Sequence, residues 1–286
     1  MAERGDVIFV GGTAFSGADA VAALLGGHPD VVAIPVALRF HSDPRGIPAL
    51  LNGRLGLEDF ISELRSHEEG SVIPSGALDE AVAALREGYH SDPLESCRTL
   101  FWTAMAAIAD LDGARALVEA SPGNLLEAQT LVRLVPGARF VHVARDGRDV
   151  AGLARESDAG PHRMAAALEW WADGLREIER GFRGEEDGAP YAIPEERFAT
   201  VVLDELTAGD RDAAYGELLS RLGLQAESPR AAPLESAAIA RGRWHRHERG
   251  PAAWFFKRRY ARTLSELDAE GNHAAPPLRA IYGRLG

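Results

Sequence analysis

Residues 7–30 read VIFVGGTAFSGADAVAALLGGHPD and place three kinds of segment in a fixed order. An apolar run comes first, a glycine-rich turn follows, and an amphipathic run ends at His28 and Pro29. This order predicts a strand over residues 7–10, a loop, and a helix over residues 17–25. Glycines let backbone N–H groups approach a ligand closely, and the helix adds the positive end of its dipole. Such a turn suits an anion such as a phosphate.

The charges in this turn oppose a phosphate. No lysine or arginine occurs between residues 7 and 27, and Asp19 places a carboxylate where a phosphate would bind. A carboxylate about 4 Å from a phosphate oxygen disfavours binding by about 1–4 kcal/mol. The alternative interpretation is that Asp19 stabilises the dipole of a helix whose loop holds no anion. In both cases the loop has little need for a phosphate.

Length and composition exclude several classes of protein. With 286 residues, 46% of them hydrophobic and 26% charged, the chain can bury one substantial core, so we expect a single domain over residues 1–286. The formal net charge of -12 argues against nucleic acid or an anionic membrane as a partner. Cys97 is the only cysteine, so neither an intrachain disulfide nor a cysteine-based metal site is expected. The polar N-terminus and the lack of any apolar stretch of about 18 residues predict a cytoplasmic protein.

The rest of the chain alternates between apolar runs and helical patterns. Further strands are expected over residues 31–35, 116–119, 140–143 and 200–203. Further helices are expected over residues 57–65, 78–87, 97–110 and 164–182, from the turn at 121–124 through 133, and from 145 into 155. Repeated strand–helix units predict an α/β fold with a central parallel sheet flanked by helices. Ligands then bind at the carboxyl ends of the strands.

A second informative stretch, RFVHVARDGRDVAGL, covers residues 139–153. A buried strand ends there in Arg145 and Arg148, which alternate with Asp146 and Asp149. Arginine is the side chain best shaped for bidentate phosphate contact, and a strand end fixes its position well. The alternative is a local ion-pair network at a helix start. His142, between two valines, is predicted to be a hydrogen-bonded core histidine.

The two stretches, in this order, resemble the PAPS-dependent sulfotransferase superfamily, above all the bacterial enzymes that act on small molecules or sugars. PAPS is 3'-phosphoadenosine 5'-phosphosulfate. The resemblance implies a P-loop-like sulfotransferase fold in which Gly12, Ser16 and Gly17 contact the 5'-phosphosulfate. It likewise places Arg145 and Arg148 at the 3'-phosphate and Arg243 in a C-terminal segment that closes over the nucleotide. Other matching segments are HPD at 28–30, LRFH at 38–41, SPGN at 121–124, EWW at 169–171, LDEL at 203–206 and GRW at 242–244.

The chain departs from the family pattern at the positions that handle charge. The resemblance predicts a cation where Phe15 stands, two hydroxyls at Ala18 and Asp19, an acidic base at Ala37, and a serine at Leu153. Each lost charge-assisted contact costs about 1.5–3 kcal/mol, and a lost transition-state donor about 2.7–4 kcal/mol. We therefore expect sulfuryl transfer to be lost or strongly reduced. PAPS or adenosine 3',5'-bisphosphate is a cofactor only if the donor site is functional.

Candidate catalytic residues are Asp19, His41 and Glu119. The loop that contains His41 is expected on the acceptor side of the cleft, and a histidine beside a carboxylate can act as a base near neutral pH. Glu119 ends a predicted strand just before the turn at 121–124, where its carboxylate is expected to face the cleft or else to serve as a cap or ion pair. The residues expected to contact a substrate are Phe15, Arg39, Phe40, Asp43, Trp170 and Trp171. Asp43 before Pro44 is also typical of a turn, and both tryptophans also fit a core.

The C-terminal region is rich in basic residues. They are Arg241, Arg243, His245, Arg246, His247 and Arg249, followed by the run at 257–259. In the family such a segment closes over the nucleotide, whereas the alternative here is a solvated surface helix.

Three functions remain open at this point. The predicted one is acid/base-assisted chemistry on a small, largely apolar metabolite, in a sulfotransferase fold that no longer uses PAPS. The second is a working PAPS-dependent sulfotransferase that acts on a hydroxyl of a small molecule or sugar. The third is a non-catalytic binding protein. The sequence does not indicate an oligomeric state.

Overall fold

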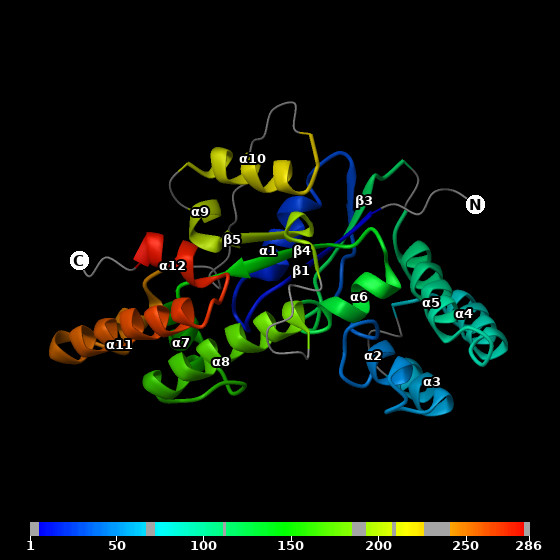
Figure 1. Cartoon of the computed structure of the whole chain (residues 1–286), viewed down its shortest axis with the longest axis horizontal. Helices are drawn as coiled ribbons and strands as arrows, with labels where there is room; N and C mark the ends of the chain where they lie inside the picture. The colour runs from blue at the N-terminus through cyan, green and yellow to red at the C-terminus, as the bar shows by residue number, and fades with distance from the viewer. Residues whose placement is uncertain are drawn as a thin grey trace.

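A computed structural model describes residues 6–66, 72–110, 113–184, 193–207, 210–225 and 241–282. Five strands form a parallel sheet in the order β2-β3-β1-β4-β5 (Figure 1). They are β1 (Asp6–Gly11), β2 (Val31–Ala33), β3 (Ala116–Glu119), β4 (Arg139–Ala144) and β5 (Phe198–Val202). The predicted α/β fold, a central parallel sheet flanked by helices, is confirmed.

The central strand β1 is buried on both faces. Val7 and Phe9 pack into one apolar cluster, whereas Ile8 and Val10 pack into another on the opposite face of the sheet. Strands covered on both sides are apolar at successive positions rather than at alternate ones. This explains why the run VIFV reads as continuously hydrophobic.

Two layers of helices cover the sheet. The helices α1 (Ala18–Leu25), α9 (Leu203–Thr207) and α10 (Arg211–Arg221) lie on one face, with Val21 and Tyr215 in the same apolar cluster as Val10. On the other face lie α6 (Ala128–Leu134) and α8 (Met164–Arg183), where Phe182 packs near Phe9. Figure 1 shows α9 and α10 above the sheet and α6 and α8 below it.

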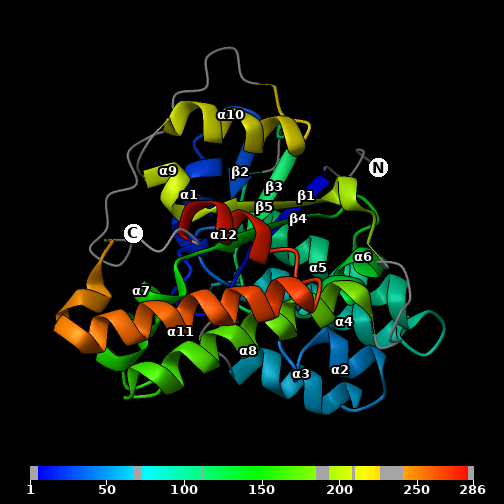
Figure 2. The ribbon, with the colours of Figure 1, turned by 60° about the vertical axis from the view of Figure 1, so that its left-hand side comes forward.

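The remaining helices extend the lower layer at its two ends. Near α6 lie α2 (Ile47–Leu51), α3 (Leu57–Ser66), α4 (Ser75–Gly88) and α5 (Pro93–Ile108). At the other end α7 (Gly147–Glu156), α11 (Gly250–Ala269) and α12 (Ala275–Tyr282) share an apolar cluster with α8. Figure 2 shows α11 running along α8. Two short 3-10 turns are η2 (Glu195–Arg197) and η4 (Arg243–Arg246).

Several element boundaries differ from those expected. The second strand ends at Ala33, two residues before Pro35, whose nitrogen cannot donate to a sheet. The helix expected directly after the turn at 121–124 begins only at Ala128. Helix α5 starts earlier than expected because Asp92 caps it, accepting from the Glu95 N–H at 3.0 Å, and Pro93 occupies its first turn. None of the described helices has the length and apolar character needed to cross a membrane.

Candidate ligand cleft

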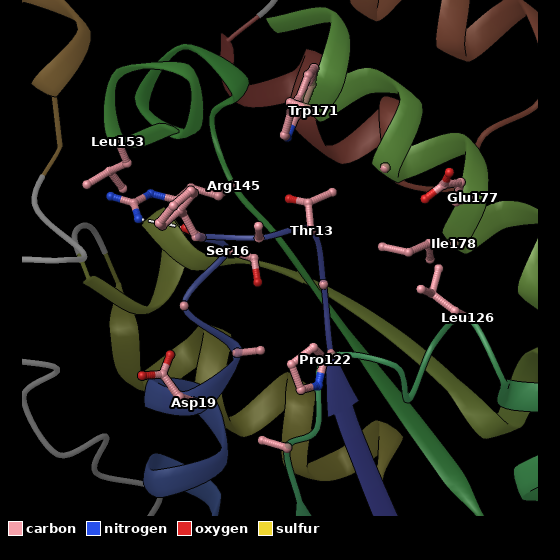
Figure 3. A pocket seen from close by; sticks show the side chains of 18 of the residues that line it. Thr13, Ser16, Asp19, Pro122, Leu126, Arg145, Leu153, Trp171, Glu177 and Ile178 are labelled. Atoms are coloured by element: carbon pink, nitrogen blue, oxygen red, sulfur yellow. Dashed lines mark hydrogen bonds between the residues drawn. The ribbon is translucent and has the colours of Figure 1, made fainter. Parts of the chain in front are cut away.

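A cavity of about 580 Å³ lies at the carboxyl ends of β1, β3 and β4. Its walls come from residues 11–20 after β1, residues 120–122 after β3, Arg145 after β4, and one side of α8 (Figure 3). Parallel α/β sheets bind their ligands at this edge, where loops diverge from neighbouring strands. The cavity is therefore the candidate functional site.

The glycine-rich loop lines the cavity as expected from the sequence. A Cβ atom on Gly12 would lie 2.5 Å from the Val143 carbonyl oxygen, so this position has no room for a side chain. Gly17 has φ +87° and precedes α1 without a side-chain cap. Because the first N–H groups of a helix lack intrahelical acceptors, the start of α1 offers uncapped donors beside the cavity. Ser16, also in the lining, is 2% exposed.

Phe15 stands in this loop where the resemblance predicts a cation. Its φ of +61° is unusual for a bulky residue, and such conformations cost of order 1–3 kcal/mol. The Phe15 ring lies 6.3 Å from the Trp170 ring, centroid to centroid, and both line the cavity. The loop therefore presents an aromatic ring to the cleft at this position.

Asp19 lies in the first turn of α1, where a carboxylate stabilises the helix dipole. Its side chain is exposed. In Figure 3 the Asp19 carboxylate faces away from Pro122, which lies on the other side of the cavity. Asp19 therefore lies at the rim of the cleft.

Arg145 follows β4 and lines the cavity, as expected of a strand-end arginine. It is 3% exposed, and its Nη1 donates to the Phe15 carbonyl oxygen at 2.9 Å. Burial lowers the pKa of this guanidinium below its ordinary value, although the nearby carboxylate of Asp149 acts in the opposite direction. An arginine so placed still carries its charge. Leu153 lies beside it in Figure 3, at the position where a serine hydroxyl was expected.

Arg148 and Arg243 do not belong to the cavity lining. Arg148 donates from Nη2 to Asp146 at 2.8 Å and lies 4.8 Å above the Tyr260 ring. Arg243 pairs with Glu156, with Nη1 and Oε2 2.6 Å apart. The ion-pair alternative therefore describes Arg148 correctly, and protein carboxylates contact both arginines.

His41 and Glu119 lie together, and both are 0% exposed. The Nε2 atom of His41 is 3.0 Å from Glu119 Oε2 and 3.1 Å from Asn124 Oδ1. Because both of these oxygens accept, Nε2 must carry the hydrogen. Glu119 also accepts from the Ser121 N–H at 3.0 Å and from the Ser121 hydroxyl at 2.5 Å. Burial disfavours the charged carboxylate, but His41 and these hydrogen bonds outweigh it and lower the Glu119 pKa.

This network lies behind the cavity wall. Ser121 lines the cavity, whereas His41 and Glu119 do not. The His41 ring is 5.7 Å from Phe9 and 5.6 Å from Phe101, which draws its loop into the core. Arg39, Phe40 and Asp43 are also outside the cavity lining; Phe40 is buried, whereas Arg39 is exposed. On this side Ser121 and Pro122 therefore border the cavity.

The long helix α8 supplies the wall that the sequence indicated only in part. Trp170 and Trp171 line the cavity as expected, and Trp171 is also a core residue at 1% exposure. Gly174, Glu177 and Ile178 line it as well. Their spacing of four, seven and eight residues from Trp170 is the signal that could have identified them, since such positions share one helix face.

Comparison with known proteins decides the family. A family model described as "Sulfotransferase family" matches residues 7–228. The chain belongs to the sulfotransferase family. No curated protein matches this sulfotransferase-family chain.

Three solved structures share the sulfotransferase fold with it. The sulfotransferase domain of the Synechococcus PCC 7002 olefin synthase has 16% identity and a TM-score of 0.51, with 94% of this chain and 97% of that chain covered. A sulfotransferase from Alicyclobacillus acidocaldarius has 16% identity and a TM-score of 0.54, with 94% and 96% covered. The sulfotransferase domain of the curacin biosynthetic pathway has 15% identity and a TM-score of 0.52, with 93% and 99% covered.

The charges around the cleft of this sulfotransferase-family protein are unevenly distributed. Among the described residues that line the cavity, Arg145 is the one lysine or arginine. Three carboxylates, those of Asp19, Asp173 and Glu177, belong to the same lining. Among the described parts of the chain, no group of three or more His, Cys, Asp or Glu side chains is arranged to hold a metal ion.

Proposed function

We propose that this sulfotransferase-family protein binds a small, largely apolar molecule in the cleft, and that PAPS-dependent sulfuryl transfer is lost or strongly reduced. The observation that carries the proposal is the charge of the described lining, with one arginine against three carboxylates. PAPS brings several negative charges to a site, so this lining does not fit it.

Two positions make the mismatch larger. Phe15 packs on Trp170 where a cation would contact the phosphosulfate, and Leu153 replaces a hydroxyl beside Arg145. Two lost contacts at about 1.5–3 kcal/mol each weaken the nucleotide by roughly 10²-fold to 10⁴-fold. The uncapped start of α1 alone does not offset that loss, because a helix dipole contributes about 0.3–1 kcal/mol at exposed sites.

The same walls suit an apolar ligand. Phe15, Trp170, Ile178 and Leu126 surround a volume in the range of small-molecule sites. Within the described lining, a proton transfer would fall to Asp19, Asp173 or Glu177, because His41 lies behind Ser121. Acid/base-assisted chemistry on the bound molecule is therefore proposed through these carboxylates and not through His41.

A second candidate is a working PAPS-dependent sulfotransferase. Arg145 in the cavity lining and the open N-terminus of α1 favour it, because both suit a phosphate. Under this alternative the nucleotide binds in spite of Phe15 and Asp19.

The test is a gain of nucleotide binding. Phe15→Arg combined with Asp19→Thr should raise the affinity for adenosine 3',5'-bisphosphate by at least about tenfold, or about 1.4 kcal/mol, as measured by calorimetry. Val72→Arg with Asp59→Thr is the matched control, since it changes the net charge equally at exposed positions outside the cavity lining. Equal affinity in the test variant and the wild type would show that the loop does not limit nucleotide binding.

A further inference from the structure

Resting on the proposed function, we infer that the ligand of this cleft is an apolar molecule with a protonated amine that faces Glu177. The same ligand carries a hydrogen-bond acceptor that faces the indole N–H of Trp171. Three features of α8 lead to this assignment.

The first feature is a buried donor. Trp171 is 1% exposed, and its Nε1 has no hydrogen-bond partner within the described structure. In Figure 3 the indole nitrogen lies at the end of the ring nearest Thr13 and the centre of the cavity. Leaving a buried N–H unpaired is unfavourable, so an acceptor on a ligand at this point would be stabilising.

The second feature is the carboxylate of Glu177, which points into the cavity in Figure 3. Within the described part of the chain Glu177 pairs with Arg180, whose Nη2 lies 3.9 Å from Glu177 Oε1, and because both side chains are exposed this is a weak pair. Asp173 differs, because its oxygen lies 2.9 Å from Arg176 Nη1. Glu177 is therefore the carboxylate of this helix that is better placed to bind an ammonium group.

The third feature is the spacing between these two groups. Trp171 and Glu177 are six residues apart, which corresponds to about 9 Å along a helix. Between them, a Cβ on Gly174 would come within 3.1 Å of Thr13 Cγ2, so the β1 loop packs closely against the helix there. Ile178 and Leu126 line the cavity near Glu177 in Figure 3. A matching ligand therefore has an apolar body between its amine and its hydrogen-bond acceptor.

The charged residues of the cavity lining favour a positively charged ligand over a negatively charged one. An anionic group near α8 meets the carboxylates of Asp173 and Glu177, whereas Arg145 lies on the opposite side of the cavity in Figure 3. A cation is instead attracted by these carboxylates. The expected order of affinity is amine, then alcohol, then carboxylate.

The experiment compares three probes of one shape by calorimetry at about pH 7. They are 4-phenylbutylamine, 4-phenylbutan-1-ol and 4-phenylbutyrate. The amine should bind at least about tenfold more tightly than the alcohol, and the carboxylate should bind most weakly. Glu177→Gln should bring the amine to within about threefold of the alcohol. Glu217→Gln, an exposed change on α10 outside the cavity lining, is the matched control and should leave the order unchanged.

A fourth probe tests the role of Trp171. The probe 4-(4-methoxyphenyl)butylamine carries an ether oxygen at the end of the molecule opposite its amine, with an apolar body between them. The methoxy group should raise affinity at least about threefold in the wild type, and Trp171→Phe should abolish that gain while the plain amine still binds.

The outcomes separate this inference from the proposed function. Equal binding of amine and alcohol, tighter binding of the carboxylate, no effect of Glu177→Gln, or no amine binding at millimolar concentration each overturns the inference. The proposed function survives these results as long as adenosine 3',5'-bisphosphate does not bind the wild type. Micromolar binding of that nucleotide would instead overturn the proposed function itself.

Discussion

Removing His41 should destabilise the fold and leave the cleft intact. His41 and Glu119 are both 0% exposed, and the imidazole is the basic partner of that carboxylate. Deleting one member of a buried ion pair leaves an uncompensated charge and costs about 3–5 kcal/mol. We expect His41→Ala to lower the free energy of unfolding by that amount, measured by urea unfolding monitored through tryptophan fluorescence.

Two controls sharpen this prediction. His247 pairs with Glu156 at 3.0 Å but is partly exposed, so His247→Ala should cost less than about 1 kcal/mol. The double change His41→Phe with Glu119→Gln removes the buried carboxylate together with its imidazole partner and should recover part of the loss. Binding of 4-phenylbutylamine should change by less than about threefold in His41→Ala, because His41 is outside the cavity lining.

The pH dependence of the free energy of unfolding follows from the lowered pKa of Glu119. A carboxylate whose folded pKa lies below its unfolded value of about 4.3 stabilises the protein above that pH. This stabilisation is lost as pH falls through the folded pKa. The difference in stability between wild type and His41→Ala should therefore shrink as the pH falls below about 4, where Glu119 becomes protonated in both proteins. A variant with wild-type stability that has lost binding or turnover would refute the reasoning and return His41 to the active site.

Three further outcomes are expected from other parts of the chain. Gly12→Ala should destabilise the protein by about 1–3 kcal/mol, because the added Cβ would meet the Val143 carbonyl oxygen. Gly76→Ala, which has open space around its Cβ, should leave the stability unchanged, and thermal unfolding of the two variants measures the difference. Burial keeps the pKa of His142 well below its usual value, so below about pH 6.5 the unfolded chain takes up a proton at this residue and the folded chain does not. The free energy of unfolding should therefore decrease as the pH falls below about 6.5, and His142→Gln should weaken this pH dependence. Burial raises the pKa of Cys97 to about 12, so its thiol should react with a disulfide reagent only after unfolding, as followed by absorbance.

The sheet and the first loop could be predicted because their signals are local. The apolar run at 7–10 forms β1, and the glycines that form the loop follow within a few residues, so one short stretch of sequence contains both signals. Arg145 could be placed for the same reason, as the residue after a buried strand. The predicted core histidine is also confirmed, since the His142 ring is fully buried and its Nδ1 lies 2.7 Å from His273 Nε2.

The inner wall of the cleft could not be predicted because it depends on burial. The sequence predicted His41 on the acceptor side of the cleft and Glu119 at a strand end, and in the structure the two side chains are in contact. It did not indicate that aromatic rings such as Phe101 would pull His41 behind Ser121. The two residues are 78 positions apart, and no local pattern encodes the direction of either side chain.

The central claim is that the cleft no longer binds the family's nucleotide. Titration of the wild-type protein with adenosine 3',5'-bisphosphate by calorimetry tests it most directly. With one buried arginine against three carboxylates in the described lining, no binding is expected up to about millimolar nucleotide. Binding at micromolar concentration would contradict the account and identify the protein as a nucleotide-binding sulfotransferase in spite of Phe15 and Asp19.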